Sequence, residues 1–108
     1  TDRSRGLGDV YKRQIIYSPS TNSLSGPIGT CTLSKKEGSL LEFFLRNYSQ
    51  ILPRTTLLTK VWGPYAEIED GNLDNYIHFI RRRLKTVSTT TTIKTHRGVG
   101  YRLEGPHE

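Results

Sequence analysis

The stretch from Leu73 to Leu103 limits most strongly what this chain can fold into. Four apolar residues recur in it at i, i+4, i+7 and i+11, the spacing of one helix face: Leu73, Ile77, Ile80 and Leu84. Two β-prone runs follow, Ile93 to Thr95 and Val99 to Leu103. We therefore predict a helix followed by a β-hairpin, with Gly98 and Gly100 permitting the tight reversal.

The same stretch is strongly basic. It holds seven Lys or Arg residues, and it contains no Asp or Glu between Tyr76 and Leu103. The acidic residues gather immediately before it, at Glu67, Glu69, Asp70 and Asp74. Because the positive charge of this 108-residue chain, formally +6 in total, is concentrated in one stretch, we expect a polyanionic partner.

On a helical wheel, the face opposite the apolar stripe presents polar, basic and aromatic side chains. Its members are Asn72, Asn75, Phe79, Arg82 and Arg83, and Arg81 lies near the edge of the stripe. Asn72 is also a suitable N-cap residue, so we predict that the helix begins there. We expect the helix to extend to Lys85 and Ser88 to Thr92 to form a polar linker.

A first helix is predicted upstream of this stretch. Ser34 and Glu37 match a capping box at its start, and the helix should end between Asn47 and Gln50. Its buried face is predicted to consist of Leu40, Leu41, Phe44 and Leu45.

A second helix follows an apolar link at Ile51 and Leu52. Pro53 fits the first turn of this helix, because proline needs no backbone N–H there, and Gly63 ends it. Its buried stripe is predicted at Leu57, Leu58, Val61 and Trp62.

The chain before the first helix contains short β-prone segments. Ile15 to Tyr17, Leu24, and Ile28 to Leu33 are separated by turn residues such as Ser18 to Ser23. We predict a small antiparallel sheet in which Cys31 is a small sheet residue.

Residues 1–14 have no usable hydrophobic period. Asp9–Gln14, DVYKRQ, resembles the in-frame translation of a transposon end used in preparing sequencing libraries. We therefore predict that residues 1–14 are an artefact or disordered, that one domain covers residues 15–104, and that residues 105–108 are a tail. The alternative is that residues 1–14 form a flexible basic arm.

The sequence lacks the residue patterns that are typical of several classes of function. Cys31 is the only cysteine, so no intrachain disulfide can form, and the three histidines have no metal-ligand spacing. Ser34, Cys31 and the histidines show no nucleophile–base spacing, and no paired carboxylates suggest a catalytic cleft. No apolar run reaches membrane-spanning length. We expect a cytoplasmic protein that is not an enzyme and uses no metal or cofactor.

Four blocks of sequence carry a family resemblance. They are Leu33–Asn47 (LSKKEGSLLEFFLRN), Ile51–Gly63 (ILPRTTLLTKVWG), Asn72–Lys85 (NLDNYIHFIRRRLK) and Ile93–Leu103 (IKTHRGVGYRL). In this order and spacing they resemble the OmpR/PhoB-type winged helix-turn-helix, the DNA-binding effector domain of two-component response regulators. The resemblance implies an α+β fold with an N-terminal antiparallel sheet, three helices and a C-terminal β-hairpin wing.

The resemblance also implies roles by position. The helix Leu73–Lys85 would lie in the major groove of double-stranded DNA as the recognition helix, and Arg97 would reach the adjacent minor groove. The candidate DNA-binding residues are Asn72, Asn75, Tyr76, Phe79, Arg81, Arg82 and Arg83 in the helix, and Thr95, His96 and Arg97 in the wing. Arg81 and Thr95 fall at phosphate-contact positions of the family.

The loop Pro64–Gly71 matches a segment that in this family can contact RNA polymerase. Its acidic residues here are Glu67, Glu69 and Asp70. The leading hypothesis is therefore sequence-specific DNA binding as the output domain of a response regulator, in transcription regulation, with an upstream receiver domain missing from this fragment and a dimer on DNA. The alternative is a winged-helix protein-interaction module that docks through this acidic loop.

Two positions depart from the family pattern. Gly38 stands inside the first helix where the family usually has an aromatic residue, which leaves a core position for neighbours to fill. Phe79 stands where some members carry a base-contacting Arg. It either contacts a thymine methyl group, takes part in a domain or dimer contact, or has no role. His78 is interpreted as a solvated residue, and His96 as either a DNA-backbone contact or a spectator.

Overall fold

The computed structural model describes residues 9–12, 14–63 and 70–105, without the side chains of Lys12 and of residues 70–72. Its elements are β1 (Val10–Lys12), β2 (Ile15–Ser18), β3 (Ser23–Gly26), β4 (Gly29–Thr32), α1 (Lys35–Arg46), β5 (Ile51–Pro53), α2 (Arg54–Trp62), α3 (Asp70–Val87), β6 (Thr92–His96) and β7 (Gly100–Glu104).

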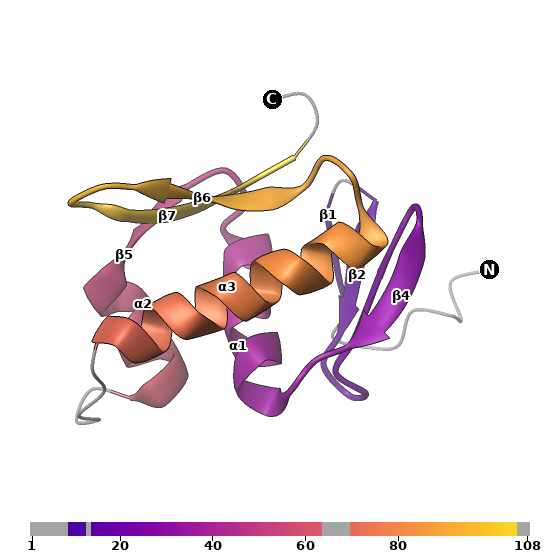
Figure 1. The fold of residues 1–108 in the computed structure, drawn as a ribbon. Helices are drawn as coiled ribbons and strands as arrows, with labels where there is room; N and C mark the ends of the chain where they lie inside the picture. The colour runs from indigo at the N-terminus through magenta and orange to yellow at the C-terminus, as the bar shows by residue number, and fades with distance from the viewer. Residues whose placement is uncertain (1–8, 13, 64–69, 106–108) are drawn as a thin grey trace.

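The described strands form two antiparallel sheets. Strands β1 to β4 make a four-stranded sheet in chain order, and the second sheet has the order β5-β7-β6. In Figure 1, α3 crosses the molecule in front of α1, with the N-terminal sheet at one end and the three-stranded sheet along one side. This arrangement confirms the predicted α+β fold with a C-terminal hairpin.

The N-terminal sheet includes residues that were predicted to be an artefact or disordered. Strand β1 pairs with β2 so that Val10 lies opposite Tyr17, and Val10 is buried in the core. The edge of β2 offers unpaired backbone groups that an extended neighbouring segment can satisfy. The origin of residues 1–14 as a library artefact stays a prediction, but residues 10–12 belong to the folded sheet.

Helix α1 begins at the predicted capping box. The Ser34 hydroxyl accepts the Glu37 N–H at 3.2 Å, and the Glu37 carboxylate accepts the Ser34 N–H at 3.1 Å. Its buried face contains the four predicted residues, Leu40, Leu41, Phe44 and Leu45. Gly38 is buried as well, and a Cβ there would collide with the hydroxyl of Tyr17. Tyr17, whose hydroxyl donates to Asn22 at 2.8 Å, therefore occupies the space next to this glycine.

The segment between α1 and α2 differs from the prediction. Ile51–Pro53 is a strand paired with β7, where a plain link was predicted, and Pro53 is the N-cap of α2 and not part of its first turn. Of the predicted stripe in α2, only Leu57 is fully buried. The others are partly buried against the core: Leu58, Val61 and Trp62. Helix α2 packs mainly on α1, so one of its sides faces outward.

Helix α3 is longer than predicted at both ends. It begins at Asp70, so Asn72 lies inside the helix and the predicted cap was wrong. It continues to Val87, which is fully buried. The predicted apolar stripe is confirmed, because its four residues are at most 1% exposed: Leu73, Ile77, Ile80 and Leu84. This buried stripe fixes which face of α3 is turned outward.

The connection from α3 to the hairpin is structured, although it was predicted as a polar linker. Ser88 and Thr91 are buried. The Ser88 hydroxyl accepts the backbone N–H groups of Thr90 and Thr91, each at 3.2 Å. These bonds satisfy buried N–H groups in the tight connection between α3 and β6, and so help to fix where β6 begins relative to α3.

Two glycines shape the wing for different reasons. Gly98 has φ +75°, a conformation that favours glycine, at the turn between β6 and β7. Gly100 was predicted to serve the turn, but it is the first residue of β7. A Cβ at Gly100 would collide with the Leu52 carbonyl, so this glycine lets β5 and β7 approach closely.

Candidate nucleic-acid interface

The outward face of α3 carries the side chains that the helical wheel predicted. Asn75, Phe79, Arg82 and Arg83 are all exposed, and Phe79 retains 45% exposure. His78 is also exposed, as predicted, with its ring centroid 6.2 Å from that of Phe79. Amide, aromatic and guanidinium groups on one rigid helix face can contact both base edges and phosphates.

Tyr76 lies at the border of this face and joins α3 to α2. Its half-buried ring makes an edge-to-face contact with Trp62, with centroids 5.2 Å apart and an interplanar angle of 71°. Such a pair stabilises the helix packing. Tyr76 therefore has a packing role that the sequence did not reveal, and its contact with DNA stays a prediction.

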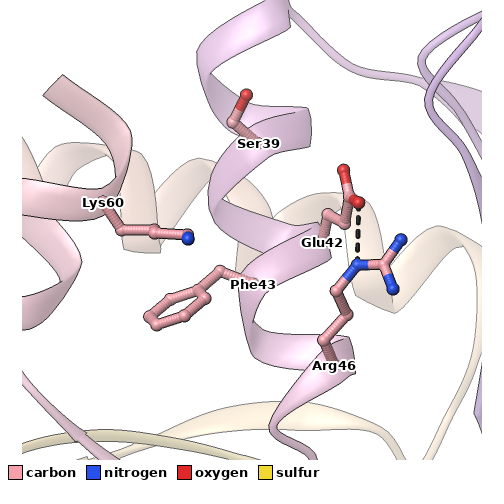
Figure 2. A pocket seen from close by; sticks show the side chains of 5 residues that line it. All are labelled: Ser39, Glu42, Phe43, Arg46 and Lys60. Atoms are coloured by element: carbon pink, nitrogen blue, oxygen red, sulfur yellow. Dashed lines mark hydrogen bonds and ion pairs between the residues drawn. The ribbon is translucent and has the colours of Figure 1, made fainter. Parts of the chain in front are cut away.

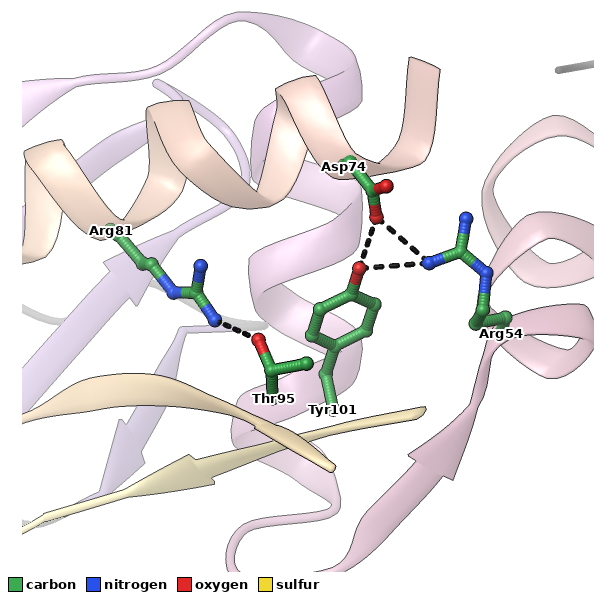
Figure 3. Close-up of polar contacts among 5 residues, drawn as sticks. All are labelled: Arg54, Asp74, Arg81, Thr95 and Tyr101. Carbon is green, nitrogen blue, oxygen red and sulfur yellow. Dashed lines mark hydrogen bonds and ion pairs between the residues drawn. The ribbon is translucent and has the colours of Figure 1, made fainter. Parts of the chain in front are cut away.

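Arg81 connects α3 to the wing. Its Nε donates to the Ile93 carbonyl at 2.7 Å. Its Nη2 donates to the Thr95 hydroxyl at 2.6 Å, the bond drawn in Figure 3. Arg81 and Thr95, which both fall at predicted phosphate-contact positions, are thus bonded to each other, and their contact with phosphate stays a prediction. The planar guanidinium can serve both acceptors at once, which fixes the position of β6 beside α3.

The wing tip is the second exposed part of the interface. Arg97, Gly98 and Val99 form the turn, and the Val99 N–H donates to the His96 carbonyl at 3.0 Å. Arg97 is exposed, and Val99 is 53% exposed. The hairpin therefore presents a cationic side chain at its end, separate from the basic face of α3.

A polar cluster that the sequence analysis missed joins α2, α3 and β7 (Figure 3). Arg54 donates to the Asp74 carboxylate and the Tyr101 hydroxyl, each at 2.8 Å, and Tyr101 also donates to Asp74. The hydrogen bonds from Arg54 and then Tyr101 lower the pKa of Asp74 below its ordinary value. Burial, followed by the bond to Asp74, raises the pKa of Tyr101. No local pattern marks these residues, because they are far apart in the chain.

A hollow of about 220 Å³ lies between this cluster and the wing. His96 and Arg97 line it together with the three cluster residues. Nε2 of the half-buried His96 is shielded from solvent, and no described group forms a hydrogen bond with it. His96 thus faces the α3–wing junction, which leaves both sequence-based interpretations of this residue open.

Some predicted residues cannot be placed. Glu67 and Glu69 lie outside the described residues, and of Asp70 only the backbone, at the start of α3, is described. The Asn72 side chain is likewise outside the description. The predicted contacts of these four residues with RNA polymerase or DNA stay predictions.

Another hollow, of about 300 Å³, lies between α1 and α2 and is lined by Ser39, Glu42, Phe43, Arg46 and Lys60 (Figure 2). Arg46 donates to Glu42 at 2.9 Å, and the Lys60 ammonium lies 5.6 Å from the Phe43 ring centroid. Within the described ranges no His, Cys, Asp or Glu side chains form a group of three or more that could hold a metal ion. Nor does any helix in those ranges have the length and apolar character to span a membrane.

Comparisons with known proteins agree with this geometry. Residues 29–103, more than half of the chain, match the family model described as "Transcriptional regulatory protein, C terminal". The transcriptional regulatory protein DltR of Streptococcus agalactiae is 38% identical over 90 residues, which are 83% of this chain and 40% of DltR. CusR of Escherichia coli is 37% identical over 75 residues, which are 69% of this chain and 33% of CusR.

A solved structure of similar fold is the DNA-binding domain of E. coli CadC. It superposes with a TM-score of 0.78 at 26% identity, covering 91% of this chain and 92% of that one. The chain spans about 40% of the length of the curated relative DltR. The winged-helix fold, the α3–wing arrangement and the family match agree, and the chain belongs to the family of C-terminal domains of transcriptional regulatory proteins.

Proposed function

We propose that this domain binds double-stranded DNA sequence-specifically, as the output domain of a two-component response regulator. The observation that carries the proposal is the exposed basic face of α3 beside a hairpin with an exposed arginine at its tip. The family match and the similarity to a domain described as DNA-binding support it.

The geometry suits two adjacent grooves of duplex DNA. The major groove is wide enough for one α-helix, and its base edges carry a distinct pattern of donors, acceptors and methyl groups. The outward face of α3 would enter there, with Arg82 and Arg83 near phosphates or bases. A narrow minor groove concentrates negative potential, which favours the insertion of Arg97 from the wing.

The proposal includes partners beyond this chain. Because DltR is much longer than the matched region, a receiver domain preceding this domain in the intact protein is expected. Dimerisation on DNA and contact with RNA polymerase through Glu67, Glu69 and Asp70 are further parts of the proposal. The domain would act in the cytoplasm without a cofactor, and it would bind and not catalyse.

Fluorescence anisotropy tests the proposal. Labelled genomic fragments are titrated with the domain at several salt concentrations. Affinity should fall steeply with salt, with a log–log slope of about −0.9 for each phosphate neutralised, and some fragments should bind far more tightly than others. Salt-independent absence of binding to every fragment would contradict the proposal.

Charge reversal distinguishes this function from a protein-interaction module. Arg82→Glu combined with Arg83→Glu should abolish specific binding. The matched control is Lys35→Glu combined with Lys60→Glu, which makes the same charge change at exposed positions outside α3 and the wing. The control should retain most of the affinity. A regulatory activity that survives reversal at Arg82 and Arg83 would favour the protein-interaction alternative.

A further inference from the structure

Phe79 lies on the outward face of α3. The helix turns its apolar stripe inward, and Ile77 and Ile80 are at most 1% exposed, whereas Phe79 between them is 45% exposed. The ring is therefore outside the core. A single exposed apolar side chain is ordinary on a protein surface, so the inference depends on what surrounds Phe79 and not on its exposure alone.

The neighbours of Phe79 define what could cover it. Asn75 lies one turn before it and Arg82 and Arg83 one turn after it, all exposed on the same side of the helix. The two guanidinium groups can neutralise phosphates, and the Asn75 amide can pair with a base edge, so these neighbours suit DNA. Phe79 is thus an apolar spot in the middle of a surface that otherwise matches a polyanion.

One apolar group in the major groove fits this spot. Of the four bases only thymine carries a methyl group at the groove edge, and apolar side chains contact it. We propose that Phe79 contacts a thymine methyl group, so that the domain prefers a T·A pair at the position facing Phe79. This inference rests on the proposed DNA-binding function and identifies the residue that sets one base preference.

Removal of a single methyl group tests the contact. A preferred duplex is selected from random sequences with the wild-type domain, and each thymine is then replaced in turn by deoxyuridine, which lacks only the methyl. At one position the replacement should weaken wild-type binding by about fourfold, the factor expected for one buried methyl-sized group. Phe79→Ala should bind the thymine and deoxyuridine duplexes equally at that position.

Two further variants make the test specific. Ile28→Ala removes an apolar side chain that is 56% exposed in the turn between β3 and β4, and it should keep the full deoxyuridine effect. Phe79→Arg should shift the preferred base at that position to guanine, because arginine pairs with the guanine edge. Melting temperatures of all variants should stay close to that of the wild type, since neither site belongs to the core.

Each other outcome has a definite meaning. If no deoxyuridine replacement weakens binding, or if the effect persists in Phe79→Ala, then Phe79 does not contact a thymine methyl. An equal loss of affinity on all sequences in Phe79→Ala would show that Phe79 sets no base preference and would overturn the inference, while DNA binding by the domain would stand. If the wild-type domain selects no duplex at all, the proposed function itself fails.

Discussion

Arg81 in α3 donates a 2.6 Å hydrogen bond to the hydroxyl of Thr95 in β6. With its second bond, to the Ile93 carbonyl, this arginine ties α3 to the wing. The distance between the two parts that we propose to bind DNA is therefore set within the domain before any DNA is bound. Such preorganisation reduces the entropy lost on binding.

Arg81→Ala should destabilise the domain by about 1–3 kcal/mol, because two acceptors lose a charged donor. Chemical denaturation measures this free energy. Arg82→Ala is the matched control, since Arg82 is an exposed neighbour on the same helix, and its effect should stay within about 0.5 kcal/mol. Equal effects of the two substitutions would show that Arg81 does not hold the wing.

Gly38→Ala should destabilise the domain although alanine favours helices. The added methyl would meet the Tyr17 hydroxyl, and forcing extra volume into a packed site costs about 1–3 kcal/mol. A thermal unfolding experiment on the single variants and the double variant tests the cause. In a Tyr17→Phe background the cost of Gly38→Ala should become smaller, because the closest atom is gone. A stabilising Gly38→Ala would contradict the observed packing.

Asp74 should make the stability of the domain sensitive to acid. Hydrogen bonds from Arg54 and then Tyr101 lower the pKa of Asp74 in the folded protein. The contribution of Asp74 to the free energy of unfolding is therefore fully present above its ordinary pKa of 3.8, and it is lost as the pH falls through the lower pKa of the folded state. The Asp74 side chain is 56% exposed, so the contribution should be below about 1 kcal/mol.

The check is to compare denaturation at neutral pH with denaturation at about pH 2.5, below the ordinary pKa. Asp74→Asn should be less stable than the wild type at neutral pH, and the difference should shrink in acid. If the wild type and Asp74→Asn differed in free energy of unfolding by the same amount at both pH values, the effect of the substitution would not depend on the ionisation of Asp74. That result would contradict the prediction.

Arg97→Ala should weaken DNA binding most on sites with an A·T-rich flank. There the narrow minor groove attracts an inserted arginine, and a loss of about five- to tenfold is expected, with a smaller loss on G·C-rich flanks. Anisotropy titrations on duplexes that differ only in the flank measure this. Equal losses on both flanks would indicate a plain phosphate contact.

Features encoded by neighbouring residues could be predicted from the sequence. The capping box of Ser34 and Glu37 and the inward stripe of α3 depend on helical spacing alone, and both are confirmed. Strand β5 could not be predicted in the same way. Its three residues are a strand only because they pair with β7, some fifty positions later.

The candidate site likewise combines features that follow from neighbouring residues with features that depend on the tertiary fold. The outward placement of Asn75 and Phe79 follows from helix periodicity, and the structure agrees with it. The cluster of Arg54, Asp74 and Tyr101 arises from three elements that only the tertiary fold brings together. Local patterns show which way a side chain faces, whereas its partner depends on packing between distant segments.

We propose that the outward face of α3 and the wing tip together form the DNA interface. Amide chemical-shift mapping by NMR, with a selected duplex added to the labelled domain, tests it most directly. The largest changes should fall on α3 around Asn75, Phe79 and Arg82 and on the wing around Arg97, with little change at the α1–α2 hollow around Glu42. Changes concentrated at that hollow, with α3 and the wing unaffected, would contradict the claim.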